Sequence, residues 1–281
     1  LPGLAVCVQV REDGPEKLAG LDLKMAEGVK NIETGEPLKT EHIFHMASVS
    51  KLFTASGILQ LCERGKLDLE DRLADRLPFV KIGDPRMGEI RLKHMLTHTS
   101  GMEDVEDYHW DTPRTDEAAL KDYACSEEVR ESHMLWSPQE NRFRYSNMAY
   151  ELLGLVIAEV SEMSYEDYMR QEILEPLGMK DSTFLTHRRA GGSLKLEDLS
   201  RAGMAMPHTK DEEKHIVLEK HYPYNREHGP SSTLTSNISD LAKWADIHLK
   251  RACLNKRSMK KYGMHMQKYS TTEREWDWAG L

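Results

Sequence analysis

The sequence predicts a mixed α/β fold in which two subdomains enclose a cleft. A β-branched apolar run over residues 4–10 is typical of a strand. After Ser48 the period changes, and apolar side chains recur at helical spacing until Arg64, where Gly65 is typical of a helix end. From residue 66 to about residue 220 strand signals almost vanish and helical ones replace them. A cleft between subdomains is a usual place for a binding site.

The remaining elements follow from the same patterns. Short strands are predicted over residues 24–29 and 43–46. Ser164 and Asp167 resemble a capping box at a helix start. Further helices are predicted over residues 90–96, 117–131, 147–160, 165–174, 196–206 and 239–251.

These elements divide the chain into three segments. We expect the first part of an α/β subdomain in residues 1–66, a helical subdomain in 67–221, and the second part of the α/β subdomain in 222–281. A chain of 281 residues is long enough for one large domain, or two interleaved ones, with a well-buried core.

Composition excludes several classes of function. The formal charge is −9, and an acidic surface repels phosphate backbones, so no nucleic-acid partner is expected. No stretch approaches the roughly 20 apolar residues of a membrane span. No signal peptide is visible, which leaves a cytoplasmic location and an extracytoplasmic one after processing both open. The oligomeric state is not encoded in any pattern that we recognise.

Cysteine and histidine spacing predicts no metal site. Cys7, Cys62, Cys125 and Cys253 lie far apart and include no Cys-x-x-Cys pair, so buried free thiols are expected rather than disulfides or zinc ligands. The histidines include no His-Glu-x-x-His, and those at 94 and 98 are expected to make local hydrogen bonds.

The first motif with chemical meaning is Ser48-Val-Ser-Lys51. A serine at a helix start lies near unpaired backbone N–H groups, and Lys51 follows one turn later on the same face. A neutral lysine can take the hydroxyl proton, which requires its pKa to fall by roughly three units, or about 4 kcal/mol. Ser-x-x-Lys alone occurs by chance, but this one follows a strand and begins a helix, as a nucleophile motif should.

The second motif is Tyr145-Ser146-Asn147, in a loop before an apolar helix. A phenol can carry a proton between a serine, a lysine and a leaving group. Asn147 can hold the lysine or bind a substrate amide. Alternatively, Ser146 or Asn147 caps the following helix while Tyr145 packs beside it.

Together these motifs resemble those of the serine β-lactamase and penicillin-binding-protein-like hydrolases, which include class C β-lactamases, D-alanyl-D-alanine carboxypeptidases and related esterases. The similarity covers most of the chain from residue 4 to about residue 248. The segments that carry it are 45–51 (His-Met-Ala-Ser-Val-Ser-Lys), 90–101, 145–154, 175–181 (Glu-Pro-Leu-Gly-Met-Lys-Asp) and 231–244.

The resemblance implies an antiparallel sheet flanked by helices, with an inserted all-helical subdomain. It also implies acyl transfer through a serine ester, with Ser48 as nucleophile, Lys51 as its base partner and Tyr145 as proton carrier. Asn147 would bind the substrate amide, and the Ser48 N–H would be one of two oxyanion donors. No metal or organic cofactor is implied. The substrate is a small molecule or a peptide, and D-alanyl peptides, β-lactams and small esters all stay open.

One family motif lacks a convincing match. The resemblance calls for a third motif, a Lys- or His-containing triad ending in glycine on a strand beside the nucleophile. Lys261-Tyr262-Gly263 fits the bare pattern, but it comes early and has a bulky tyrosine in the middle. We therefore expect the last strands, with this motif, to be missing from the chain. The alternative function is a catalytically inactive or truncated binding or sensing module.

Overall fold

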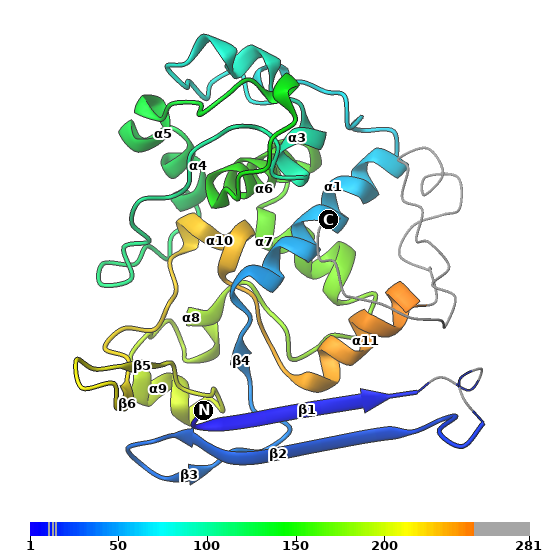
Figure 1. The fold of residues 1–281 in the computed structure, drawn as a ribbon, viewed down its shortest axis with the longest axis vertical. Helices are drawn as coiled ribbons and strands as arrows, with labels where there is room; N and C mark the ends of the chain where they lie inside the picture. The colour runs from blue at the N-terminus through cyan, green and yellow to red at the C-terminus, as the bar shows by residue number, and fades with distance from the viewer. Residues whose placement is uncertain (11, 13, 15, 250–281) are drawn as a thin grey trace.

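The computed structural model describes residues 1–10, 12, 14 and 16–249. The chain starts in an antiparallel sheet of β1 (Gly3–Gln9), β2 (Asp22–Asn31) and β3 (Glu36–Pro37), in the order β1-β2-β3. Helices lie above this sheet and fill most of the remaining volume (Figure 1). This mixed arrangement confirms the predicted α/β fold class.

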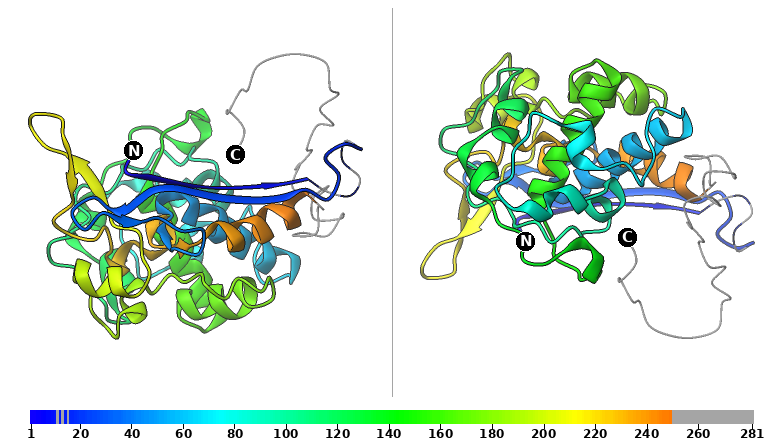
Figure 2. Two further views of the ribbon diagram at one scale, coloured as in Figure 1. Left: turned by 90° about the horizontal axis from the view of Figure 1, so that it is seen from below. Right: turned by 90° about the horizontal axis from the view of Figure 1, so that it is seen from above.

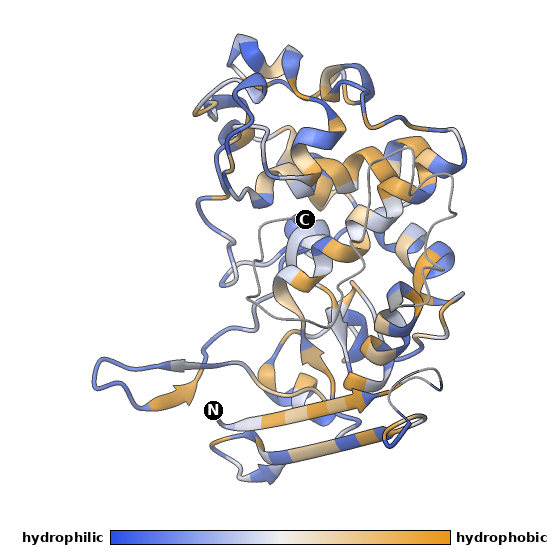
Figure 3. Cartoon of the chain, turned by 45° about the vertical axis from the view of Figure 1, so that its right-hand side comes forward, coloured by the Kyte–Doolittle hydropathy of each residue, from blue (hydrophilic) through white to orange (hydrophobic). Residues whose placement is uncertain are grey.

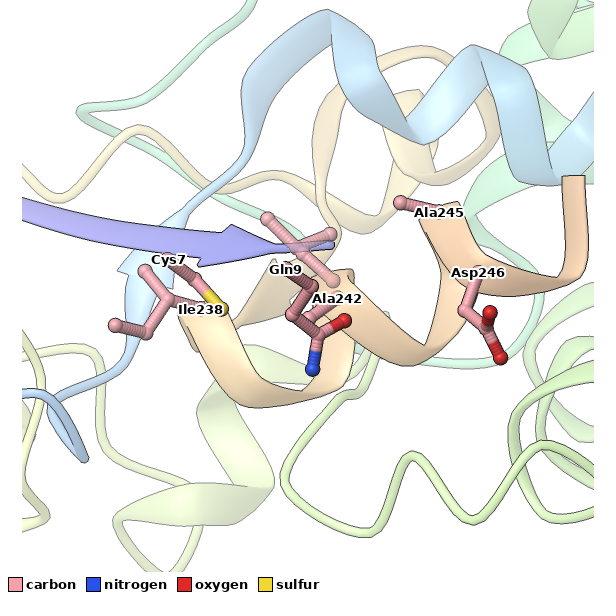
Figure 4. A pocket seen from close by; sticks show the side chains of 7 residues that line it. Cys7, Gln9, Ile238, Ala242, Ala245 and Asp246 are labelled. Carbon is pink, nitrogen blue, oxygen red and sulfur yellow. The ribbon is translucent and has the colours of Figure 1, made fainter. Parts of the chain in front are cut away.

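The two faces of the sheet differ in what covers them. Helix α11 (Ile238–Leu249) runs alongside β1 and β2 in both views of Figure 2. A groove of about 410 Å³ lies between β1 and α11, where Cys7 and Gln9 face the helix (Figure 4). On the opposite face apolar side chains are 41% to 54% exposed, and Figure 3 shows apolar residues along both strands. These exposed residues are Leu4, Val8, Leu23 and Met25.

A second, two-stranded pairing positions the start of the first long helix. Strand β4 (Phe44–His45) pairs antiparallel with β7 (Thr235–Ser236), residues that are far away in the sequence. From β4 the chain enters a 3-10 turn, η1 (Ala47–Val49), and then α1 (Ser50–Glu63). Gly65 has a φ of 71°, a left-handed conformation that favours glycine at a helix end. The predicted helix and its end are confirmed.

The middle of the chain is helical, and α6 (Asn147–Ser161) is its centre. This helix is buried on nearly all sides, because it contacts α1, α3, α4, α7 and α10. None of the helices within the described residues is both long and apolar enough to cross a membrane. The other helical segments are α2 (Leu73–Arg76), η2 (Pro85–Glu89), α3 (Leu92–Leu96), α4 (Ala119–Ala124), α5 (Glu127–Glu131), η3 (Pro138–Glu140), α7 (Tyr165–Tyr168), the π-helical η4 (Met169–Leu174), α8 (Thr186–Arg189), α9 (Leu196–Arg201), η5 (Arg226–His228) and α10 (Gly229–Ser232).

One helix in this region differs from its prediction, and a short hairpin was not predicted. The helix expected over residues 117–131 is broken into α4 and α5, because the Ser126 side chain accepts from the Val129 N–H and starts a new helix. The region also contains a hairpin of β5 (His208–Lys210) and β6 (Ile216–Leu218), closed by a turn in which Asp211 accepts from the His215 N–H. The division at residues 66 and 221 stays a prediction.

Candidate active site

Ser48 lies on the surface where the chain turns from β4 into α1. The preceding residue, Ala47, has a φ of 44°, a left-handed conformation that costs free energy in a non-glycine residue and often occurs at functional sites. Two hydrogen bonds of the buried Ser50 hydroxyl fix the turn. The hydroxyl donates to the Ala47 carbonyl at 2.7 Å and accepts from the Leu234 N–H at 3.0 Å. The local backbone therefore leaves Ser48 exposed on a fixed support.

Two side chains meet the Ser48 hydroxyl. The Tyr145 hydroxyl donates to Ser48 Oγ at 2.7 Å, and Lys51 Nζ donates to the same atom at 3.3 Å. Tyr145 and Ser48 are separated by 97 positions in the sequence, so only the fold brings them together. The structure thus places these three predicted site residues within direct hydrogen-bonding distance.

Lys51 is almost fully buried, and its amine has three acceptors. Besides Ser48 Oγ, these are Asn147 Oδ1 at 2.5 Å and the Ser231 carbonyl, on α10, at 2.9 Å. An ammonium group has three N–H donors, whereas a neutral amine has two donors and a lone pair. In the neutral form Lys51 can therefore keep both buried acceptors and turn its lone pair toward the Ser48 hydroxyl.

The protonation states of Lys51 and Tyr145 suit different roles. Burial lowers the pKa of Lys51 to about 8, against the opposing effect of the Glu151 and Asp104 carboxylates. Burial also raises the pKa of Tyr145 above its usual value, although the hydrogen bond to Ser48 opposes the shift. Tyr145 is therefore a neutral phenol near pH 7, and Lys51 is the group that can accept a proton.

The two ends of the Asn147 amide are both engaged. Its Oδ1 accepts from Lys51, and its Nδ2 donates to both Asp104 oxygens, at 2.9 and 3.2 Å. The Asp104 carboxylate also accepts from the Asn147 backbone N–H at 2.6 Å. These contacts support a role in holding Lys51, the first of the two roles that the sequence suggested. Binding of a substrate amide by Asn147 stays a prediction.

His98 does not follow the local pattern that was expected of it. Its ring stacks on Tyr145 with centroids 4.5 Å apart, and its Nδ1 accepts from the Ser146 N–H, 48 positions later in the sequence. Burial lowers the pKa of His98 to about 4, so the ring is a neutral acceptor that fixes the Tyr145 loop. His94 does bond locally, since its Nδ1 accepts from the Arg91 N–H.

A comparison with known families agrees with this geometry. A family model described as "Beta-lactamase" matches residues 1–279. The chain belongs to the β-lactamase family.

Known relatives of this β-lactamase-family chain are longer than the chain itself. It is 26% identical over 250 residues to penicillin-binding protein 4 of Amycolatopsis lactamdurans, a match that covers 89% of the chain and 60% of that protein. The octameric penicillin-binding protein homologue from Pyrococcus abyssi superposes with a TM-score of 0.72 at 27% identity, covering 92% of the chain and 55% of that structure. A class C β-lactamase from Rhodobacter sphaeroides shares the fold, with a TM-score of 0.65 at 22% identity over 93% and 65%.

Sequence reasoning missed three groups around Lys51. Asp104 lies in a loop and Ser231 contributes only a backbone carbonyl, so neither gives a sequence signal. Glu151 did give one, because the sequence places a carboxylate within an apolar helix, one turn after Asn147, and the structure buries it fully. Its Oε2 accepts from the Ser231 N–H at 3.2 Å.

Close packing of α6 against α10 keeps Ser231 near Lys51. A Cβ atom on Gly154 would lie 2.0 Å from Pro230 Cγ, which is far inside van der Waals contact. Only glycine at this position of α6 allows α10 to approach so closely, and the Ser231 carbonyl follows Pro230 directly in the chain.

Two features of this β-lactamase-family site concern its surroundings. The best match to the third motif, Lys261-Tyr262-Gly263, lies outside them. Ser48 does not line the groove between β1 and α11, nor a second hollow of about 300 Å³ beside β4. Ser48 itself is exposed among the described residues.

Proposed function

We propose that this chain is a serine hydrolase that forms an acyl-enzyme on an amide or ester. The observation that carries the proposal is the pair of hydrogen bonds onto Ser48 Oγ, from Tyr145 at 2.7 Å and from Lys51 at 3.3 Å. A serine hydroxyl becomes nucleophilic only when a base takes its proton, and a buried lysine with a lowered pKa is such a base.

The proposed reaction uses each of the three groups once. Ser48 Oγ attacks the carbonyl carbon while its proton passes to the neutral Lys51 amine. The resulting ammonium then has acceptors in Asn147 Oδ1 and the Ser231 carbonyl. The Tyr145 phenol donates a proton to the leaving amine or alkoxide and is reprotonated by the Lys51 ammonium, and water later hydrolyses the Ser48 ester. The Ser48 N–H as an oxyanion donor is part of the proposal.

The substrate class is an acyl compound with an amide or reactive ester bond. The relative from Amycolatopsis lactamdurans is named a penicillin-binding protein, which supports reaction with a β-lactam or with a peptide amide. D-alanyl peptides and small esters stay open as substrates beside β-lactams.

Adduct mapping tests the proposal. After incubation with a fluorescent penicillin, and separately with a fluorophosphonate, intact-mass spectrometry is expected to show one adduct, and peptide mapping to place it on Ser48. Ser50 is an internal control, since its hydroxyl is fully buried and engaged by Ala47 and Leu234. No adduct with either reagent would indicate the inactive binding module instead, and an adduct on another residue would refute the site.

The rate of adduct formation is expected to rise with pH. The neutral Lys51 amine is the reactive form, and with a pKa of about 8 roughly a tenth of the molecules carry it at pH 7. The rate should therefore increase about tenfold per pH unit at lower pH and level off above pH 8. Time courses from roughly pH 5.5 to about pH 9.5, a range that spans the pKa of Lys51, check this. A rate that falls with rising pH would exclude Lys51 as the base.

A further inference from the structure

One buried histidine, close in the chain to Ser231, has ring nitrogens without hydrogen bonds among the described residues. The ring of His228 is only 1% exposed, yet neither of its nitrogens has a hydrogen-bond partner among the described residues. Buried polar groups are nearly always satisfied, so an orphaned ring of this kind needs an explanation. The rings of Tyr108 and Tyr123 pack edge-on against it, with centroids 4.9 and 4.8 Å away, and they fix its plane.

The two nitrogens of His228 face different carboxylates. Nδ1 lies 3.4 Å from Glu151 Oε1, and Nε2 lies 3.9 Å from Glu227 Oε2. In metal sites one ring nitrogen of a histidine usually bonds to a carboxylate, a carbonyl or water, and this contact orients the other nitrogen toward the metal. Glu151 has the position of that supporting carboxylate, because its Oε1 has no hydrogen-bond partner among the described residues.

A third ligand completes the arrangement. His109 Nδ1 lies 4.0 Å from Glu227 Oε2, and one ligand atom from each of His109, Glu227 and His228 lies within 4.8 Å of the others. Bonds of about 2.0–2.2 Å to a tetrahedral zinc place its ligands roughly 3.4 Å apart. The distances between the three ligand atoms must shorten toward this value when zinc binds. The side chain of His109, which is 48% exposed, can move to shorten them.

We propose that His109, Glu227 and His228 form a Zn²⁺ site with water in the fourth position. Two imidazoles and one carboxylate are a ligand set that suits zinc better than Ca²⁺ or Mg²⁺. Glu227 binds through Oε2 alone, because Arg114 Nη1 lies 3.8 Å from Oε1. Asn225 Nδ2 donates to Oε2 at 3.0 Å. When zinc binds, this hydrogen bond is lost or Oε2 is shared between the metal and the Asn225 amide.

The site joins two segments that support Lys51. His109 follows the loop in which Asp104 holds Asn147, and His228 immediately precedes α10, which supplies the Ser231 carbonyl. The proposed acyl transfer does not use the metal. Zinc at this place therefore acts by fixing the two segments relative to each other, which predicts a gain in thermal stability.

Metal titration tests the site directly. Protein treated with EDTA and desalted is titrated with ZnCl₂ in a calorimeter, and one equivalent is expected to bind with a Kd in the micromolar range or below. His109→Ala should weaken binding at least tenfold, and Glu227→Gln should do the same. Zinc at about 100-fold excess over the wild-type Kd should raise the Tm of the wild type by about 5–10 °C, and that of the two variants by clearly less.

The chain offers a matched control. Asp211, Glu213 and His215 also bring ligand atoms within 4.8 Å, but their side chains are more exposed and belong to the β5–β6 turn. His215→Ala should leave zinc affinity unchanged. Because His109 is exposed, its variant is expected to fold, and Co²⁺ in place of zinc should give tetrahedral absorption bands that His109→Ala removes. No binding by the wild type, or binding lost in His215→Ala and kept in His109→Ala, would overturn the proposal.

Discussion

Replacing Lys51 with methionine is expected to slow acylation of Ser48 by on the order of 10²–10⁴-fold. Methionine fills a similar volume but cannot take a proton, so the hydroxyl loses the base that lies 3.3 Å away. The measurement is the rate of adduct formation with a fluorescent penicillin and with a reactive ester, followed by intact mass.

The variant also removes a buried positive charge near Glu151 and Asp104, so its folding needs a control. Lys30 is a matched position, since it is similarly buried, at 4% exposed against 5%, and it donates to the Ser200 carbonyl at 2.8 Å. Lys30→Met should lower the Tm and leave the acylation rate of the folded protein close to that of the wild type. Equal loss of rate in both variants would indicate a structural effect rather than a missing base.

Replacing Tyr145 with phenylalanine is expected to reduce turnover of amide substrates by about 10²-fold or more. The change removes the hydroxyl that donates to Ser48 Oγ at 2.7 Å, while the aromatic ring keeps its stacking on His98. An amide nitrogen must be protonated before it can leave, whereas an activated phenolate ester leaves without a proton. The loss should therefore be much larger for an amide than for an activated ester, as kcat/KM for the two substrates will show.

Tyr168→Phe is the matched control for this change. The Tyr168 hydroxyl donates to Gln60 Oε1 at the same 2.7 Å, but it lies in α7 and makes no contact with Ser48. It should cost some stability and leave the ratio of amide to ester turnover unchanged. If Tyr145→Phe slowed both substrates equally, its role would be to position Ser48 and not to protonate the leaving group.

The sequence predicts those parts of the site that depend on local geometry. Ser48 and Lys51 are one helical turn apart, so their proximity follows from the helix alone. Tyr145 required the second motif and the resemblance, because its contact with Ser48 arises only in the fold. The acceptor at Ser231 was unpredictable, since every residue has a carbonyl and only the packing of α10 aims this one at Lys51.

The same distinction applies to the fold. Residues 4–10 and 48–64 carry strong periodic patterns, and the structure forms a strand and a helix there. The break between α4 and α5 depends on one hydrogen bond to Ser126, and the β5–β6 hairpin depends on a turn at Asp211. Single capping and turn interactions of this kind compete with periodicity, and a pattern read over many residues does not resolve them.

The packing that places Ser231 beside Lys51 requires a glycine at position 154, and this glycine makes α6 less stable. In a helix interior glycine is less favourable than alanine by about 1 kcal/mol, so Gly154→Ala would stabilise α6 if the helix stood alone. At this position the added methyl group would displace Pro230 and, with it, the carbonyl of Ser231 that anchors Lys51. Glycine at position 154 therefore lowers the intrinsic stability of α6 and, in exchange, permits the close packing that keeps the Ser231 carbonyl beside Lys51 in the proposed acyl-transfer site.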